Sequence, residues 1–387
     1  READAAAAAV QQLKEEGVDL IVCLSHGGVN PAGFGADRDL AIQVPDIDVI
    51  VSGHTHVDLA QPLVVGKTLI VSAGAYGKYV GRLEATVRPG RAVQLDSYRL
   101  VTVDDSVAAD QSAPLQEKLT ELVQAVDAQV LAPLGVTYAT TVVESGFDLT
   151  LPDYTEGNLG DLITDSILHA TAQRLGRRPD VAVESAGAIR DTLPAGQLWV
   201  ADAFRSLPLG IGLDLQGGYP LLTFFLQPQE LKAGLEVLTI AEELVGSPDF
   251  FLQLAGVRVT WNPLGMWFDR VTRIELWREE QGWQEVDLAE QRLYEIAVNY
   301  YNAALLSLVE AKTGGALKLT PRDAAGEPLP SLAAAIVDDQ PGEEGLQELK
   351  QWRAFIELLQ SFPDLDDDQI PDLPAEYAQP QGRIVAQ

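Results

Sequence analysis

The chain has 387 residues, which is long enough for two or three domains with sizeable cores, and 47% of them are hydrophobic. Its 57 Asp and Glu residues outnumber its 27 Lys and Arg residues and give a formal net charge of -30, which argues against a nucleic acid or an anionic membrane as its main partner. The single cysteine excludes an intrachain disulfide framework, and no apolar run is long enough to span a membrane as a helix.

Helical and strand patterns fill the first hundred residues. They predict a helix over 5–16, strands over 18–24, 47–51 and 68–72, and a hairpin over 80–87 and 92–103. The loops after the strands carry His, Gly and Ser, and open α/β sheets bind their ligands off such strand ends. The chain opens inside the first helical pattern, without a capping residue, so we expect it to be the remainder of a longer protein.

The polar stretch after residue 104 indicates a linker, and a second α/β block follows it. The predicted elements are helices over 115–130, 158–175 and 228–238, strands over 180–183 and 293–298, and a hairpin over 271–277 and 283–288. The acidic tail contains one more predicted helix, over 346–359. These patterns predict an α/β protein with mixed sheets.

Three of the four histidines follow predicted strands. His26 lies in the loop after the first strand, and His54 and His56 follow the second strand behind a glycine that permits a tight turn. Imidazole is the commonest protein ligand of transition metals, and such a cation needs about four to six ligands. Alternatively, these side chains only cap strand ends by hydrogen bonding. Further ligands for a single site could come from Asp37, Asp48 or Asp58.

Several motifs resemble one enzyme family. Residues 24–28 (LSHGG) and 46–56 (DIDVIVSGHTH) are similar to the C-terminal half of a calcineurin-like metallophosphoesterase domain. Segments similar to the 5′-nucleotidase C-terminal domain follow at 156–165, 187–190, 207–210 and 251–257. The chain is therefore identified as resembling the 5′-nucleotidase family over most of its length, with part of an αββα metallophosphoesterase sandwich followed by the C-terminal α/β domain.

The resemblance implies two divalent metal ions, Zn, Mn or similar, in the intact protein. His26 and His54 would bind one ion and His56 its neighbour. The family's other ligands include an Asp-x-His motif and a bridging Asp, and an Asn-His pair assists the leaving group. This sequence contains neither an Asp-x-His nor an Asn-His. We therefore expect the chain to be inactive by itself.

The resemblance also implies a substrate site in the second block. Arg190 follows a small-residue turn and could bind a phosphate or ribose, although an ordinary ion pair is the alternative. Phe251 and Tyr301 match the two aromatic rings that hold the nucleobase, and both could instead be core residues. Ser185 and Ile211 stand where the family has Asn, and the ribose-binding Gly-Gly-Asp-Gly is absent. The substrate could therefore be another phosphate ester.

The C-terminal tail carries a repeated acidic pattern. Four carboxylates occupy positions 1, 3, 5 and 9 of a possible Ca²⁺ loop, namely Asp364, Asp366, Asp368 and Asp372. Gln369 stands where the turn favours Gly, and Ala375 stands where a terminal Glu would complete the ligands. A solvated acidic tail is the alternative.

The resulting expectation is a fragment of a nucleoside 5′-phosphate hydrolase. The expected parts are the C-terminal portion of a metallophosphoesterase domain over 1–104, a linker with a helix over 105–137, a substrate-binding domain over 138–330 and an acidic extension over 331–387. Alternatives are hydrolysis of a UDP-sugar, a cyclic nucleotide or a thiosulfate ester, or nucleotide binding without catalysis. The family resemblance implies a periplasmic, cell-surface or secreted protein with a small phosphate ester as its partner.

Overall fold

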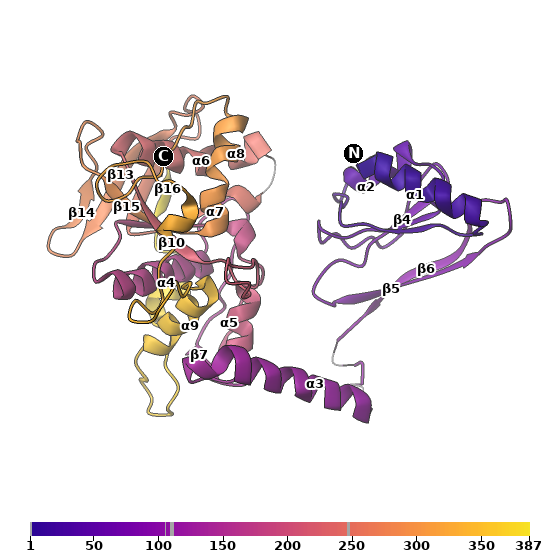
Figure 1. The fold of residues 1–387 in the computed structure, drawn as a ribbon, viewed down its shortest axis with the longest axis horizontal. Helices are drawn as coiled ribbons and strands as arrows, with labels where there is room; N and C mark the ends of the chain where they lie inside the picture. The colour runs from indigo at the N-terminus through magenta and orange to yellow at the C-terminus, as the bar shows by residue number, and fades with distance from the viewer. Residues whose placement is uncertain (1, 105, 109–111, 246–247) are drawn as a thin grey trace. The chain divides into compact units, whose positions relative to one another are not determined.

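The computed structural model describes residues 2–104, 106–108, 112–245 and 248–387. It divides into two compact units, Arg1–Glu117 (unit 1) and Lys118–Gln387 (unit 2). Both units combine helices with strands, and unit 2 has mixed sheets, so the predicted α/β class is confirmed (Figure 1). Residues 105 and 109–111 of the predicted linker lie outside the described residues.

Unit 1 is a small sheet covered by helices. Its elements are α1 (Glu2–Glu16), β1 (Val22–Leu24), α2 (Ala36–Gln43), β2 (Val49–Val51), β3 (Leu63–Val65), β4 (Thr68–Val71), β5 (Tyr79–Thr86), β6 (Gln94–Thr102) and the start of α3 (Ala113–Val126). The sheet has the order β1-β2-β4-β3, in which β1, β2 and β4 are parallel, while β5 and β6 form a separate hairpin.

Apolar residues on the strands and helices of unit 1 form one core. Ile50 and Ile70 are fully buried from neighbouring strands, and Val10 of α1 and Ala41 of α2 belong to the same cluster. Because β1 and β2 are adjacent and parallel, with Leu24 opposite Val51, their carboxyl ends lie side by side. The loops that carry the histidines therefore leave the sheet at the same edge.

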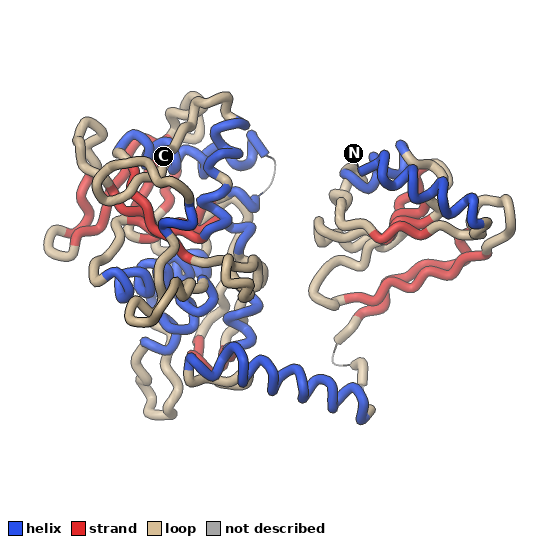
Figure 2. The backbone as a smooth tube through the Cα atoms, viewed as in Figure 1, coloured by secondary structure: helices blue, strands red, loops and turns tan. Residues whose placement is uncertain are grey.

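Unit 2 contains more helices and strands than unit 1, including two four-stranded sheets (Figure 2). Its helices are α4 (Asn158–Leu175), α5 (Val200–Ser206), α6 (Pro228–Val245), α7 (Tyr300–Ala304), α8 (Leu306–Lys312) and α9 (Gln351–Ser361). Its strands are β7 (Thr141–Ser145), β8 (Val181–Ser185), β9 (Gly196–Trp199), β10 (Leu221–Leu226), β11 (Leu252–Ala255), β12 (Val257–Trp261), β13 (Val271–Arg278), β14 (Gly282–Glu285), β15 (Tyr294–Asn299) and β16 (Ile384–Ala386). Its sheets have the orders β10-β15-β8-β11, β14-β13-β12-β16 and β7-β9.

The sheet β10-β15-β8-β11 is packed on both faces. Ala182 and Ala297 contact the cluster that contains Ile167 of α4, whereas Val181 and Val298 belong to the cluster that contains Leu235 of α6. Neighbouring positions on a strand thus bury opposite faces, as the two-residue period of a strand requires. α4 and α9 lie against each other on the first face (Figure 1).

The acidic tail is part of unit 2. Helix α9 begins at Gln351 rather than at the predicted residue 346, because the preceding residues run as extended chain and Leu349 N–H donates to the Val337 carbonyl. Phe355 of α9 is fully buried in the core cluster that also contains Leu159 of α4. The final strand, β16, pairs in parallel with β12.

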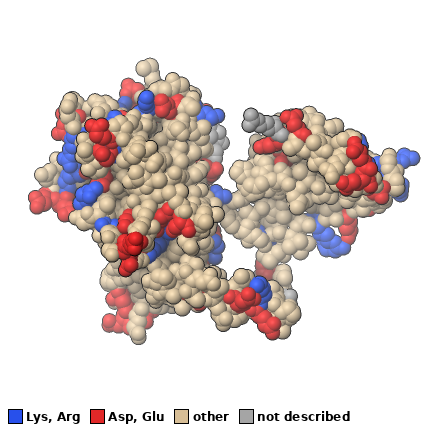
Figure 3. All heavy atoms as spheres, in the orientation of Figure 1, with Lys and Arg blue, Asp and Glu red and all other residues tan. Residues whose placement is uncertain are grey.

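Acidic side chains are spread over the face drawn in Figure 3, in keeping with the net charge of -30. Within the described ranges, no helix has the length and apolar character needed to cross a bilayer.

Candidate metal and substrate sites

Two of the predicted metal ligands lie together at the edge of the unit 1 sheet. The imidazole ring centres of His26 and His54 are 5.2 Å apart, with an angle of 54° between the ring planes. Both side chains are exposed. The backbone of His54 has φ 69° and that of His56 has φ 57°, so both residues adopt the left-handed region that is uncommon outside glycine. The loop after β2 is therefore tightly wound where it presents its histidines.

Asp37 ties the two histidine loops together. This carboxylate is 1% exposed, and it accepts hydrogen bonds from the Ser25 hydroxyl, from Gly28 N–H at 3.0 Å and from the Ser52 hydroxyl at 2.5 Å. Ser25 precedes His26, and Ser52 lies two residues before His54. Both oxygens of Asp37 therefore accept hydrogen bonds that hold the two histidine loops.

The separation of the two rings is compatible with a shared metal ion. Imidazole nitrogens bind Zn²⁺ at about 2.0–2.1 Å, and the ring centre lies roughly 1.1 Å beyond the nitrogen, so two imidazoles at a tetrahedral angle have ring centres about 5 Å apart. The observed 5.2 Å between His26 and His54 matches that separation. Imidazole is also a ligand type that suits Zn²⁺.

His56 occupies a different place in the same loop. Its ring meets that of Tyr76 edge-on, with centres 5.3 Å apart. Among the residues that the structure describes, the three histidines do not form a group whose ligand atoms all lie within 4.8 Å of one another. The ring of His56 thus contacts Tyr76, whereas the rings of His26 and His54 contact each other.

A pair of tyrosines defines the second candidate site, in unit 2. The rings of Tyr219 and Tyr301 stack with centres 5.4 Å apart and an interplanar angle of 22°. Both side chains are half-buried, so each ring has contact with solvent. Tyr219 precedes β10, and Tyr301 lies in the helix after β15, which pairs with β10. Tyr301 is predicted from the sequence but Tyr219 is not, because only the pairing of distant strands brings the two rings together.

Charged groups surround the tyrosine pair. Burial raises the pKa of the Tyr301 phenol, the charges of Asp249 and Glu184 raise it further, and the charge of Arg190 opposes them. Burial also raises the pKa of Tyr219, and the neighbouring Tyr301 and Glu184 add to that shift. The Arg190 guanidinium donates a hydrogen bond to the Gly187 carbonyl at 3.1 Å. Arg190 is thus held close to the aromatic pair.

Phe251 lies elsewhere. Its side chain is 3% exposed and belongs to the apolar core cluster of unit 2, so neither ring face is open to a ligand. Phe251 lies between the short helical turn Pro248–Phe250 and β11, where its ring packs into the core, so the structure does not present it as an open wall of a nucleobase site. Its neighbour Phe250 is less buried and lines a pocket.

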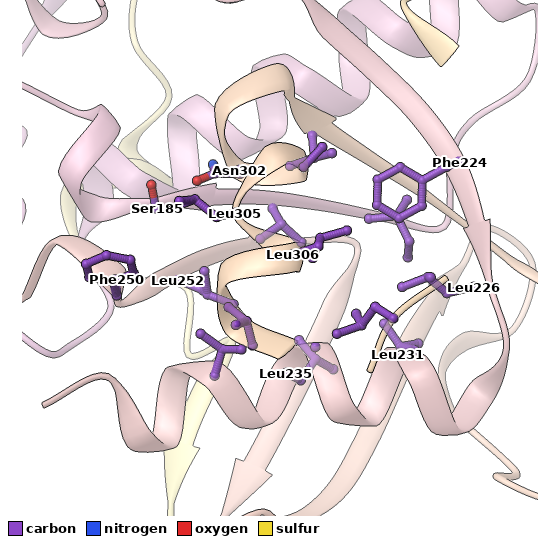
Figure 4. A pocket seen from close by; sticks show the side chains of 18 residues that line it. Ser185, Phe224, Leu226, Leu231, Leu235, Phe250, Leu252, Asn302, Leu305 and Leu306 are labelled. Atoms are coloured by element: carbon purple, nitrogen blue, oxygen red, sulfur yellow. The ribbon is translucent and has the colours of Figure 1, made fainter. Parts of the chain in front are cut away.

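That pocket is apolar (Figure 4). It encloses about 100 Å³ between the sheet and the helices α6 to α8, and aliphatic side chains such as Leu231 and Leu235 form most of its wall. Ser185 and Asn302 are the polar residues among its lining, and none of the described lining residues is charged. A phosphate ester would find no counter-charge there, so the pocket is not the place for one.

The acidic loop of the tail brings three of its carboxylates together. Asp364, Asp366 and Asp372 have ligand oxygens within 4.8 Å of one another. All four carboxylates predicted as ligands, Asp368 included, accept hydrogen bonds from backbone N–H groups of the same loop. Gln369 has φ 75°, so a non-glycine residue occupies the left-handed turn position.

Residues 135–305 match the family model described as the 5′-nucleotidase C-terminal domain. The chain is 25% identical over 298 residues to the trifunctional nucleotide phosphoesterase protein YfkN of Bacillus subtilis, covering 75% of this chain and 18% of that protein. It is 31% identical over 229 residues to an apyrase of Anopheles gambiae, covering 53% of this chain and 38% of the apyrase. The chain thus spans well under half the length of these relatives.

Solved structures share the fold. A 5′-nucleotidase precursor from Thermus thermophilus superposes with a TM-score of 0.64 at 24% identity, covering 100% of this chain and 67% of that one. The sulfate thiohydrolase SoxB of Thermus thermophilus superposes with a TM-score of 0.56 at 21% identity, covering 98% of this chain and 56% of that one. Residues 135–305 thus match the model of the 5′-nucleotidase C-terminal domain, and the chain shares the fold of these solved structures.

Proposed function

We propose that this chain is part of a dinuclear-metal phosphohydrolase that releases phosphate from nucleoside 5′-phosphates. In this proposal unit 1 supplies His26 and His54 to one metal ion and His56 to the other. Unit 2 binds the nucleotide through Arg190 and the tyrosine pair. The observation that carries the proposal is the 5.2 Å separation of His26 and His54 at the carboxyl ends of two parallel strands, in a chain with a 5′-nucleotidase C-terminal domain.

A bound pair of divalent ions would polarise the phosphoryl group and lower the pKa of an attacking water. The chain's own residues prepare the site: Asp37 fixes the loops that orient the imidazoles. The cations would also offset the repulsion between an acidic protein and an anionic substrate.

In unit 2, the proposed roles follow from side-chain chemistry. The guanidinium of Arg190 can donate two parallel hydrogen bonds to a phosphate or to ribose hydroxyls. Tyr219 and Tyr301 would stack on a base, an interaction of about 1–3 kcal/mol per base that tolerates any base. A base inserted between the two rings needs room for a further aromatic layer, so the pair, now 5.4 Å apart, would open on binding.

Other substrates are compatible with the same reaction class. Ser185 and Ile211 replace the amides that the family uses, so we keep a UDP-sugar, a cyclic nucleotide or a thiosulfate ester as alternative substrates. A nucleotide-binding module without catalysis is the alternative from another class. Because the chain lacks Asp-x-His and Asn-His motifs, we propose that it does not turn over substrate by itself.

The test is a metal titration combined with a phosphatase assay on the purified chain. We expect Co²⁺ or Zn²⁺ to bind in a manner that requires both His26 and His54, and we expect no release of phosphate from AMP with added Mn²⁺. His169→Gln is the matched control, because His169 belongs to unit 2 and bonds Gln173. Metal binding that survives His54→Ala would contradict the metal site, and turnover that His54→Ala abolishes would contradict the inactivity of the chain.

Two further properties belong to the proposal. The loop of Asp364, Asp366, Asp368 and Asp372 would bind Ca²⁺, since three of its carboxylates already converge. A calorimetric titration with Ca²⁺ should show binding that Asp366→Asn weakens, and the absence of heat would contradict the site.

Export to the periplasm, cell surface or medium is proposed from the family resemblance, and fractionation of the source cells would test it.

A further inference from the structure

A buried carboxyl group lies beneath the tyrosine pair. Glu184 is the penultimate residue of β8 and is fully buried. It accepts hydrogen bonds from Ser185 N–H at 2.8 Å, from the Asn299 side-chain amide at 3.0 Å to both oxygens, and from the Asn302 amide at 2.5 Å. The side-chain amide of Gln351 donates to it as well. Every one of these donors is a neutral amide N–H.

The donors belong to the segments that carry the two tyrosines. Asn299 and Asn302 flank Tyr301, and the Asn299 side chain also caps helix α7 by accepting from Asn302 N–H at 2.8 Å. Gln351 is linked to the other ring, because its backbone N–H donates to the Tyr219 carbonyl at 3.0 Å. Glu184 thus connects, through one carboxyl group, the chain on both sides of the stacked pair.

A second set of bonds fixes the same arrangement. Tyr300 N–H donates to the Pro220 carbonyl at 2.9 Å, which joins the residues next to Tyr301 and Tyr219. The Asn299 amide also donates to the Gln351 side-chain oxygen at 2.9 Å. The side chains of Glu184, Asn299, Asn302 and Gln351 therefore form one closed network, which we call the Glu184 network. All four are at most 9% exposed.

A carboxyl group at this position is costly for the fold. No Lys or Arg side chain among the described residues pairs with Glu184, and burial of a carboxylate without a cation is unfavourable. An apolar side chain would pack a sheet core at lower cost. In the structure the carboxyl group accepts hydrogen bonds from amides of the segments that hold Tyr219 and Tyr301, and this links those segments.

We propose that Glu184 is a positioning residue that fixes the relative positions of the Tyr219 and Tyr301 rings for a planar aromatic ligand such as a nucleobase. This inference rests on the proposed function for its ligand, but the positioning of the two rings stands on the contacts themselves. Above pH 8 the Glu184 carboxyl group is ionised and only accepts hydrogen bonds, so at that pH Glu184→Gln places an amide NH₂ against amide donors, and the test is run there. The network then has to rearrange, and the rings that it holds shift with it.

The test uses the full chain labelled with 3-fluorotyrosine. ¹⁹F resonances of Tyr219 and Tyr301 are assigned with Tyr219→Phe and Tyr301→Phe, and AMP affinity is measured by calorimetry. We expect Glu184→Gln to shift both resonances and to weaken AMP binding at least tenfold. The matched control is Glu236→Gln, because Glu236 is also a buried carboxylate of unit 2 that accepts backbone N–H groups, from Arg270 and Val271.

The outcomes are distinct. If Glu184→Gln leaves both resonances and the AMP affinity as in the Glu236→Gln control, the inference is overturned. If the unmodified chain binds no AMP, the proposed nucleotide site fails, and the shift of the two resonances still decides whether Glu184 positions the rings. Should Glu184→Gln fail to fold, Gln351→Met is the second variant, because at similar volume it removes the donor to Glu184 and the oxygen that accepts from Asn299. We expect it to shift the Tyr219 resonance, and an unchanged resonance would contradict the role of the network.

Discussion

The carboxylate of Asp37 on helix α2 accepts a hydrogen bond from the Ser52 hydroxyl at the end of β2, at 2.5 Å. The same carboxylate accepts from Gly28 N–H after β1. One buried side chain thereby joins the loops that present His26 and His54. Two histidines far apart in the sequence keep a ring separation suited to one metal ion because a third residue ties their loops together.

Asp37→Asn should weaken both the fold of unit 1 and its affinity for metal. The amide would place a donor where the carboxylate now accepts, and each buried group left without a partner costs about 1–3 kcal/mol. Urea unfolding measures the loss of stability, and a Co²⁺ titration measures the metal site. Asp39→Asn, an exposed carboxylate on the same helix, is the control and should change neither. Equal effects of the two substitutions would contradict the role of Asp37.

Gly28→Ala should disturb the histidine loops more than a matched glycine substitution does. Gly28 has φ +81°, and a Cβ there would lie 2.5 Å from the Thr55 side chain, which is next to His54. Gly66 also has a positive φ, +61°, but a Cβ there would meet nothing within 4 Å. Gly66→Ala therefore measures the backbone strain alone, about 1 kcal/mol. We expect a larger loss of stability in Gly28→Ala, together with reduced Co²⁺ binding, and equal losses would show that the contact with Thr55 is unimportant.

Stability should depend on pH through Glu184. Burial raises the pKa of Glu184 to about 8 from 4.5, although its hydrogen bonds oppose the shift. The folded chain therefore keeps a proton that the unfolded chain releases between these values, so the free energy of unfolding falls as the pH rises from about 4.5 to about 8. Asp161, whose pKa burial also raises to about 8, acts in the same direction.

Comparing the chain with Glu184→Gln isolates this contribution. The substituted chain cannot titrate at position 184, so its free energy of unfolding should fall less steeply over the same pH range. Urea unfolding at half-unit pH intervals measures both slopes. Parallel slopes would show that Glu184 does not hold its proton in the folded chain.

Arg190→Ala should separate phosphate recognition from base recognition. A guanidinium that binds the phosphate contributes to AMP affinity but not to adenosine affinity, whereas one that binds ribose contributes to both. We expect a loss of at least tenfold for AMP and little change for adenosine, measured by calorimetry. Arg205→Ala is the control, because Arg205 is half exposed and pairs with Asp191 and Asp202. If both affinities fall together, Arg190 contacts the sugar instead.

The sequence contained the signals for the strand ends and for the histidine loops. Apolar runs before His26 and before His54 predict strands there, and the structure has β1 and β2 at these places, adjacent and parallel. The length of the first strand was overestimated, since β1 covers Val22–Leu24 only. Val18 and Leu20 are exposed there, and apolar composition by itself does not reveal which residues a sheet pairs.

The aromatic site was harder to predict, because it depends on long-range pairing. Tyr219 meets Tyr301 only once β10 and β15 align over their full length, and no local pattern near Tyr219 marks it. Phe250 and Phe251 are adjacent in the sequence, so only the structure shows which of them faces the core. Glu184 did leave a signal: it is a carboxylate near the end of an apolar strand of sequence VAVES, where a buried charge is unusual.

The most direct test of the central proposal is equilibrium binding of AMP to the 387-residue chain by calorimetry, with Tyr301→Ala and Tyr219→Ala measured beside it. We predict saturable binding of AMP that each substitution weakens at least tenfold, because each removes one stacking surface. Binding that both substitutions leave unchanged, or no binding of AMP at all, would contradict a nucleotide site at the tyrosine pair.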